Sequence, residues 1–211
     1  MNITNKKDVV AIGNAMVDVF IKSDLSKING YEIIRDSMNL IDENKKNLLH
    51  KENTIHKMVA AGSAGNTIVG IGSFGGNGTF IGKIKDDEIG NFFIKDMNNS
   101  GIDFPLGTSR ASISTGCCTI FVENNGTRTM CTYLGTGSLI NEEDIKAENI
   151  INHKIAYLEG YLWDNQNAKA AMKKMISIAK KDGQKISLTL SDKFCVDRHR
   201  DSFRELIENS K

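Results

Sequence analysis

A glycine-rich segment from Ala61 to Asn66, which reads Ala-Gly-Ser-Ala-Gly-Asn, holds the residue types best suited to binding a small molecule. Small residues such as Gly62 and Ser63 let the backbone approach a ligand closely. Asn66 can donate and accept hydrogen bonds through one side chain. The helical spacing from Thr67 to Phe74 would place Asn66 where a helix begins. The alternative is an ordinary strand-to-helix turn.

Three further polar turns follow apolar runs that read as buried strands. These strands are expected at Val9–Gly13, Lys154–Tyr161 and Ile186–Leu190. The turns after them are Gly13-Asn14, Tyr161 to Asp164 and Ser191 to Phe194. Because a parallel sheet binds ligands outside the carboxyl ends of its strands, a site is expected at these turns.

Strands and helices alternate along most of the chain. Strong amphipathic spacing predicts helices at Asp86–Ser100 and Gln166–Asp182, each followed by a glycine that suits a helix end. Further helices are expected at 42–50, 67–74, 141–151 and 198–208, and a further strand at Thr79–Gly82. This order predicts an α/β fold with a mostly parallel central sheet.

Two β segments do not fit that alternation. The first, at about residues 15–40, includes a short strand expected at Tyr31, Ile33 and Ile34. The second, at about residues 112–133, contains a hairpin of Cys117–Val122 and Arg128–Tyr133 around Asn125-Gly126. Together they predict a small second sheet beside the main one.

Composition excludes several classes of partner. The 211 residues carry a net charge of +1, which gives no electrostatic reason to expect a nucleic acid or a membrane surface. The apolar run from Val9 to Ile21 is interrupted by Asn14 and Asp18 and is too short to span a bilayer. The four cysteines have neither C-x-x-C nor zinc-ligand spacing, so reduced, buried thiols in a cytoplasmic protein are expected, with a free catalytic cysteine as the alternative.

The segment from Ala61 to Gly90 closely resembles the N-terminal signature of the PfkB-type, or ribokinase-like, kinases. In that family a Gly-Gly pair precedes a small-residue turn, an Asn opens a helix, and G-K-x-G-x-D-x-x-G follows. The resemblance implies that Gly62, Ser63 and Asn66 contact a sugar. Ala61 replaces the first glycine of the pair and Lys85 replaces a later glycine.

The start of the chain is similar to the same family. Gly13 to Asp18 matches its G-N-x-x-x-D opening, which implies that Asp18 accepts hydrogen bonds from substrate hydroxyls beside Asn14. A carboxylate suits this role because it can accept from two neighbouring hydroxyls. The alternative for Asp18 is a solvated residue at a strand edge.

Two later segments resemble the adenosine-kinase-like branch of the family. The hairpin resembles a D/N-G-x-R-T segment, which implies that Arg128 holds phosphates; an exposed hairpin arginine is the alternative. The segments 157–163 and 187–194 resemble the lining of a base pocket. By that analogy Met16, Leu162 and Phe194 would enclose a nucleobase, and plain core packing is the alternative.

The family's second signature, Gly-Ala-Gly-Asp, does not occur in this sequence, and its Asn-x-x-Glu segment is not found where it is expected. The resemblance therefore implies that residues 1–211 are the N-terminal part of one three-layer ribokinase-like domain, with an incomplete central sheet and a β-sheet lid. No catalytic residue and no metal ligand are expected in this chain. The general-base Asp and the site for ATP and Mg²⁺ would lie in the C-terminal part.

The resemblance implies ATP-dependent phosphorylation of a nucleoside, first of all adenosine, or of a sugar such as fructose or ribose. A non-catalytic sugar-binding module is the alternative, and the lid would allow a homodimer. A Rossmann-like nucleotide binder is disfavoured, because Gly13-Asn14-Ala15 does not supply G-x-G-x-x-G after the first strand.

Overall fold

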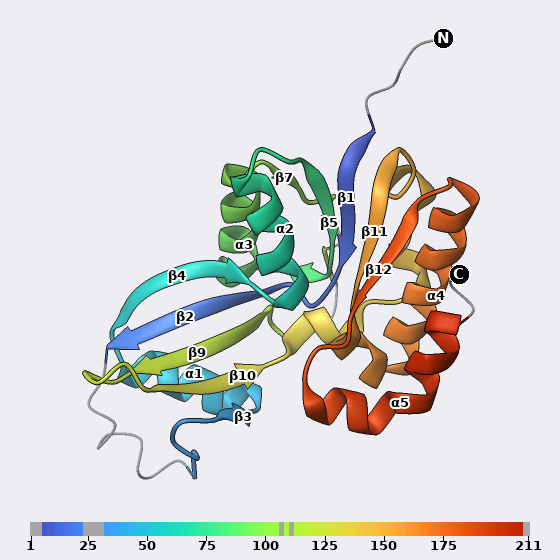
Figure 1. Ribbon diagram of the computed structural model, residues 1–211. Coiled ribbons are helices and arrows are strands. Elements are labelled where there is room, and N and C mark those ends of the chain that lie inside the picture. The colour runs from blue at the N-terminus through green and yellow to red at the C-terminus, as the bar shows by residue number, and fades with distance from the viewer. Residues whose placement is uncertain (1–5, 23–31, 106–107, 110–111, 209–211) are drawn as a thin grey trace.

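A five-stranded, entirely parallel sheet forms the centre of the chain (Figure 1). The structure is a computed structural model that describes residues 6–22, 32–105, 108–109 and 112–208. The strand order in this main sheet is β12-β11-β1-β5-β7. The strands are β1 (Lys7–Ile12), β5 (Gly78–Ile81), β7 (Ile102–Asp103), β11 (His153–Glu159) and β12 (Lys185–Thr189).

Helices cover both faces of the main sheet, so the fold has three layers. On one face, α2 (Ser63–Ser73) and α3 (Glu88–Asn99) bury apolar residues against β1 and β5. On the other, α4 (Gln166–Lys181) and α5 (Lys193–Glu208) pack with a larger apolar cluster around Trp163. The structure therefore confirms the predicted α/β architecture with a parallel sheet.

A second sheet of five strands, which we call the lid sheet, extends away from the main sheet (Figure 1). Its order is β3-β10-β9-β2-β4, with both parallel and antiparallel pairs. The strands are β2 (Met16–Lys22), β3 (Met38–Leu40), β4 (Ile55–Ala61), β9 (Gly116–Val122) and β10 (Arg128–Tyr133). Helix α1 (Glu43–Glu52) packs Leu49 against one face of this sheet.

The segment Gly82 to Gly90 ties the lid sheet to the main sheet. Asp87 caps α3 by accepting from the Gly90 amide at 2.8 Å, and its other oxygen accepts from the Thr115 amide at 2.8 Å, one residue before β9. A Cβ at Gly90 would lie 2.1 Å from the Lys85 carbonyl oxygen. The Asp and the last Gly of this motif therefore have a structural role at the base of the lid.

Most predicted elements occur at or near their expected positions. The hairpin, α3 and α4 are confirmed, and so are β1, β5, β11 and β12. Asp42 caps α1 through the Lys45 amide, as a helix starting near residue 42 requires. The glycine-rich segment differs in one respect, because α2 begins at Ser63 rather than at Thr67.

Several predictions of local structure were wrong. Ile33 and Ile34 are not in a strand, and Tyr31 lies outside the described residues; the short strand is β3 instead. The helix expected at Asn141–Ile151 is two separate 3-10 turns, Glu142–Asp144 and Ala147–Asn149. A reciprocal cap between Asn141 and Asp144 closes the first turn after three residues, and Ile145 then turns into the core in an extended conformation.

Two further elements differ from the sequence analysis. Strand β4 was not foreseen, and it lies outside the two segments expected to form the lid. Helix α5 begins at Lys193, five residues before the predicted start, and is interrupted at His199 by a non-helical conformation.

We expect Asp87→Ala to lower the free energy of unfolding by about 2 kcal/mol, because it removes a helix cap and a second hydrogen bond. Urea denaturation would measure the change. Asp86→Ala is the matched control; Asp86 is exposed and should change stability by less than about 0.5 kcal/mol. Equal losses in the two variants would contradict the role given to Asp87.

Candidate active site

Three strand ends and one helix start meet at the carboxyl edge of the main sheet. Asn14 follows β1, a 3-10 turn at Gly160–Asp164 follows β11, and Ser191 follows β12. The first turn of α2 begins beside Asn14. This is the edge at which the sequence predicts a ligand.

A buried carboxylate, Glu159, joins these elements. Its Oε1 accepts hydrogen bonds from the Asn14 backbone amide at 3.3 Å and from Asn14 Nδ2 at 2.7 Å. Its Oε2 accepts from the Ala64 amide at 2.9 Å. Glu159 is only 1% exposed, and burial raises the pKa of its carboxyl against the opposing effect of these donors.

Two glycines allow this close packing. A Cβ at Gly13 would lie 2.5 Å from Glu159 Oε2, and one at Gly62 would lie 2.3 Å from the Asn14 carbonyl oxygen. Gly62 also has a φ of +99°, which L side chains rarely adopt. Packing therefore requires both glycines, independently of any contact with a ligand.

The structure brings together five of the residues predicted to bind substrate. Ser63 starts α2 immediately after Gly62. Met16 and Asn14 both lie beside Gly62, because a Cβ added there would be 3.6 Å from Met16 Cγ and 2.3 Å from the Asn14 carbonyl oxygen. Asn66 is exposed on the first turn of α2. The binding roles of these residues stay predictions.

Asp18 lies on β2 in the lid sheet, half-buried, two residues beyond Met16 and facing the same side. Burial raises the pKa of its carboxyl to about 6, and the charge of Arg128 opposes that rise. Arg128 itself is exposed at the start of β10. A cavity of about 470 Å³, a size common for small-molecule sites, opens beside Asp18 and is lined by residues such as Phe20, Lys57 and Val122.

A larger hollow of about 550 Å³ lies at the opposite, amino edge of the main sheet. Four of its polar side chains form two pairs. His153 Nε2 lies 3.0 Å from Thr79 Oγ1, and Lys7 forms an ion pair with Asp103. We place the candidate site at the carboxyl edge, where polar groups from four elements converge.

Leu162 and Phe194, which were predicted to enclose a base, do not lie together on the surface. Leu162 is 2% exposed and belongs to the apolar core around Trp163. Phe194, in the first turn of α5, is 68% exposed. Tyr161, one residue before Leu162, is 37% exposed. Leu162 thus has the core contacts that the sequence analysis gave as its alternative, and its role at a base stays a prediction.

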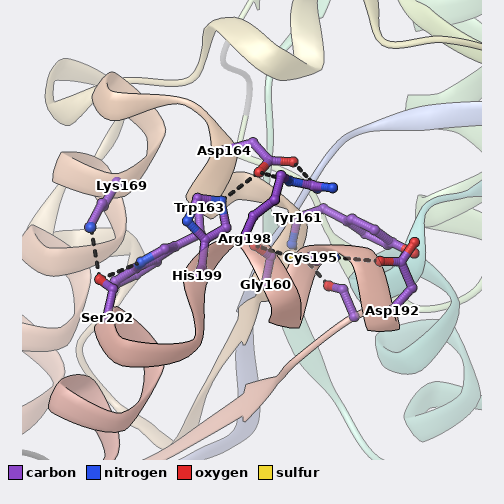
Figure 2. Close-up of polar contacts among 11 residues, drawn as sticks. Gly160, Tyr161, Trp163, Asp164, Lys169, Asp192, Cys195, Arg198, His199 and Ser202 are labelled. Atoms are coloured by element: carbon purple, nitrogen blue, oxygen red, sulfur yellow. Dashed lines mark hydrogen bonds and ion pairs between the residues drawn. The ribbon is translucent and has the colours of Figure 1, made fainter.

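Figure 2 shows the polar contacts that hold the β11 end against α5. Arg198 donates to both oxygens of Asp164, from Nε at 2.9 Å and from Nη2 at 2.7 Å. Burial raises the pKa of the Asp164 carboxyl, but the hydrogen bonds and charges of Arg198 and His199 lower it by more. The net effect is a lowered pKa. Trp163 Nε1 donates to Ser202 Oγ at 2.9 Å beyond the interruption of α5. The turn after β11 is therefore rigidly placed.

The sequence analysis did not identify Glu159 as part of the site, nor Asp144 as the ion-pair partner of Lys83. A lone carboxylate at the end of the apolar run 155–158 was the available signal for Glu159. Lys83, within the Gly82–Gly90 motif, donates to Asp144 Oδ2 at 2.8 Å in a largely buried ion pair. No local pattern identifies Asp144 as its partner, because 61 residues separate the two.

All four cysteines are free and buried, as expected. Burial raises the pKa of the thiols to about 12 for Cys117 and Cys118 and to about 11 for Cys131 and Cys195, which disfavours a nucleophilic role. Within the described residues, no helix is long and apolar enough to cross a membrane.

The profile of the pfkB family carbohydrate kinases matches residues 6–211. A ribokinase from Dictyostelium discoideum is 30% identical over 89 residues, which are 42% of this chain and 28% of that protein.

Two solved structures share the fold with substantial sequence identity. An adenosine kinase from Sinorhizobium meliloti is 38% identical with a TM-score of 0.85, over 97% of this chain and 63% of that one. A probable sugar kinase from Rhizobium etli CFN 42 is 34% identical with a TM-score of 0.85, over 98% of this chain and 63% of that one. The chain thus spans less than two thirds of each of these relatives.

We expect Asp18→Asn to raise the free energy of unfolding at pH 8 by about 1 kcal/mol and by much less at pH 4. The native state disfavours the ionised carboxyl, so the wild-type chain loses stability as pH rises from about 4 through about 6. Urea denaturation at both pH values would measure this. Asp201→Asn, at an exposed residue of α5, is the control; a pH-independent effect of Asp18→Asn would contradict the prediction.

We expect Glu159→Gln to lower the free energy of unfolding by about 2 kcal/mol at pH 7, because a buried amide group would face the N–H donors of Asn14 or Ala64. Chemical denaturation would measure the loss. Glu148→Gln, at an exposed position, should be neutral. A neutral Glu159→Gln would show that the three hydrogen bonds are not needed to join β1, β11 and α2.

Proposed function

This chain belongs to the pfkB family of carbohydrate kinases, and we propose that it supplies the substrate-binding half of a kinase that phosphorylates a hydroxyl of adenosine or a related nucleoside. The supporting observation is the convergence at the carboxyl edge. There the Glu159 carboxylate fixes Asn14 and the first turn of α2 in one place, and Asp18 on the lid sheet follows Asn14 by four residues.

Asp18 would hold and orient the reacting sugar. Its carboxylate is partly removed from water, so hydroxyl donors of a bound sugar would stabilise the charge that burial disfavours. Ser63 and Asn66 would contact the sugar from the α2 side. Arg128, exposed across the lid sheet, would attract the phosphates of the nucleotide.

ATP and Mg²⁺ are implied by the family. Among the described residues, no group of three His, Cys, Asp or Glu side chains could hold a metal ion. The resemblance to the family implies that both, together with the general base, belong to the part of a full-length family member that this chain does not span. No step through the metal is derived from these residues.

A nucleoside is favoured over a simple sugar by the aromatic residues at the strand ends. Tyr161 and Phe194 expose their rings after β11 and β12, where a base attached to the sugar could stack. Tyr161 is better placed for this than the buried Leu162, and Met16 would contact the base from β2. The identity of 38% to an adenosine kinase agrees with this choice.

A sugar kinase acting on fructose or ribose is the second candidate. The likeness to a probable sugar kinase at 34% identity and to a ribokinase over 89 residues supports it. A homodimer through the lid sheet is compatible with either candidate.

The reading frame beyond Lys211 tests the kinase assignment directly. We expect it to encode Asn-x-x-Glu and then Gly-Ala-Gly-Asp, which would supply the nucleotide site and the general base. A stop codon directly after Lys211 would contradict the proposal of catalysis and leave a binding module.

In the complete protein, we expect Asp18→Ala to lower kcat/KM at least about 100-fold for every substrate, because it removes charged hydrogen bonds to the sugar. Phe194→Ala should raise the KM for adenosine about 5-fold and leave the KM for fructose unaffected, since stacking is worth about 1 kcal/mol. Steady-state kinetics with both substrates would measure this.

Phe74→Ala is the matched control for Phe194→Ala. Phe74 is an exposed aromatic residue at the end of α2 remote from the site. Its replacement should affect neither substrate. Equal losses for adenosine and fructose in Phe194→Ala would contradict the nucleoside assignment.

A further inference from the structure

The turn between β12 and α5 is held in an unusual conformation. Ser191 has a φ of +68°, which is uncommon for a residue other than glycine. Its amide donates to Thr189 Oγ1 at 3.2 Å. Asp192 then caps α5, because its Oδ1 accepts from the Cys195 amide at 2.7 Å. Such strain persists only where the surrounding contacts impose it.

The same turn holds Tyr161 at both ends. The Tyr161 amide donates to Ser191 Oγ at 2.9 Å, and its phenol donates a hydrogen bond to the Asp192 carboxylate. In Figure 2, Tyr161 and Asp192 face each other on the side of α5 away from Trp163. Two consecutive residues after β12 thus fix one aromatic residue after β11.

The backbone before Tyr161 is equally constrained. A Cβ at Gly160 would lie 2.6 Å from the Thr189 carbonyl oxygen and 2.9 Å from Ser191 Oγ. Cys195 donates from Sγ to the Gly160 carbonyl oxygen at 3.4 Å. Tyr161 therefore has little freedom in its backbone or in its side chain.

Burial, and after it the charge of Asp192, raises the pKa of the Tyr161 phenol to about 12. The phenol consequently keeps its proton at physiological pH and remains a donor to Asp192. The ring is still 37% exposed at the carboxyl edge of the sheet. A partly exposed aromatic face, held in one orientation by hydrogen bonds from the same turn, is suited to stacking.

We propose that Asp192 is a positioning residue, which holds the Tyr161 ring as a preformed wall of the subsite for a planar aromatic base. This rests on the proposed nucleoside kinase function. Fixing a ring before a ligand arrives lowers the entropy lost on binding. Asp192 thereby favours substrates that carry a base over free sugars, although it contacts neither.

A purely structural role, as the cap of α5, is the competing explanation. Asp192→Ser separates the two. Serine caps helices about as well as aspartate, but its shorter side chain cannot reach the Tyr161 phenol. Asp197→Ser, at an exposed carboxylate of the same helix that pairs with Lys193 and Arg200, is the matched control.

The first experiment measures the Tyr161 phenol itself. The pKa would be followed by NMR of tyrosine labelled with ¹³C at Cζ, with the signal assigned by its loss in Tyr161→Phe. We expect Asp192→Ser to lower this pKa from about 12 toward the ordinary value of 10, because a negative charge is removed. Asp197→Ser should not. An unchanged pKa in Asp192→Ser would overturn the proposal.

The second experiment measures selectivity in the complete kinase. We expect Asp192→Ser to raise the KM for adenosine about 10-fold with kcat and the KM for fructose unchanged. Tyr161→Phe should do the same, and the double variant should lose no more than either single one. Equal effects on adenosine and fructose would overturn the positioning role but not the kinase function.

The two experiments separate failure of the inference from failure of the proposed function. A wild-type enzyme that phosphorylates sugars and no nucleoside would overturn both. The NMR titration would then still report whether Asp192 and Tyr161 are joined. A lowered Tyr161 pKa together with a selective loss for adenosine supports the inference.

Discussion

The carboxyl edge of the main sheet depends on one carboxylate removed from water. Burying Glu159 is unfavourable unless its oxygens are satisfied, and the available donors come from the end of β1 and the start of α2. All three elements must therefore be in place at once. The same requirement excludes side chains at Gly13 and Gly62, because a Cβ there would collide with Glu159 or with Asn14.

The position of the lid sheet depends on this edge of the main sheet. Only three residues separate β1 from β2, so fixing Asn14 also fixes where β2 leaves the main sheet and where Asp18 lies. The Asp87 contact with the Thr115 amide secures the point where β9 enters the lid sheet, and the buried ion pair of Lys83 with Asp144 holds the segment after β5. A substrate held between the two sheets would thus meet groups placed by the folded core rather than by flexible loops.

Periodicity and turn residues predicted the elements whose structure is decided locally. Helices α3 and α4 have strong apolar stripes with a glycine after each end, and Asn125-Gly126 marks the hairpin. The predictions of local structure were wrong where contacts with distant parts of the chain decide the conformation. The segment 141–151 has helical spacing, yet its isoleucines Ile145 and Ile150 are drawn into the core and break it into two turns. Leu162 was likewise predicted to contact a base, but it is buried in the apolar cluster around Trp163.

The carboxylates of Asp164, Asp18 and Glu159 differ in how the fold stabilises their charge. Donors hold the pKa of Asp164 low, so its charge is already stabilised by Arg198 and His199. Asp18 has the opposite balance, since burial dominates and only the charge of Arg128 opposes it. A carboxylate in that condition gains most from new hydrogen-bond donors, and the hydroxyls of a sugar would provide them. Glu159 is buried more completely, and burial raises the pKa of its carboxyl too, but its oxygens already accept from three N–H groups. The motif around Asn14 and Asp18 thus combines Asn14, whose side chain is held by Glu159, with Asp18, which we propose acts on a ligand.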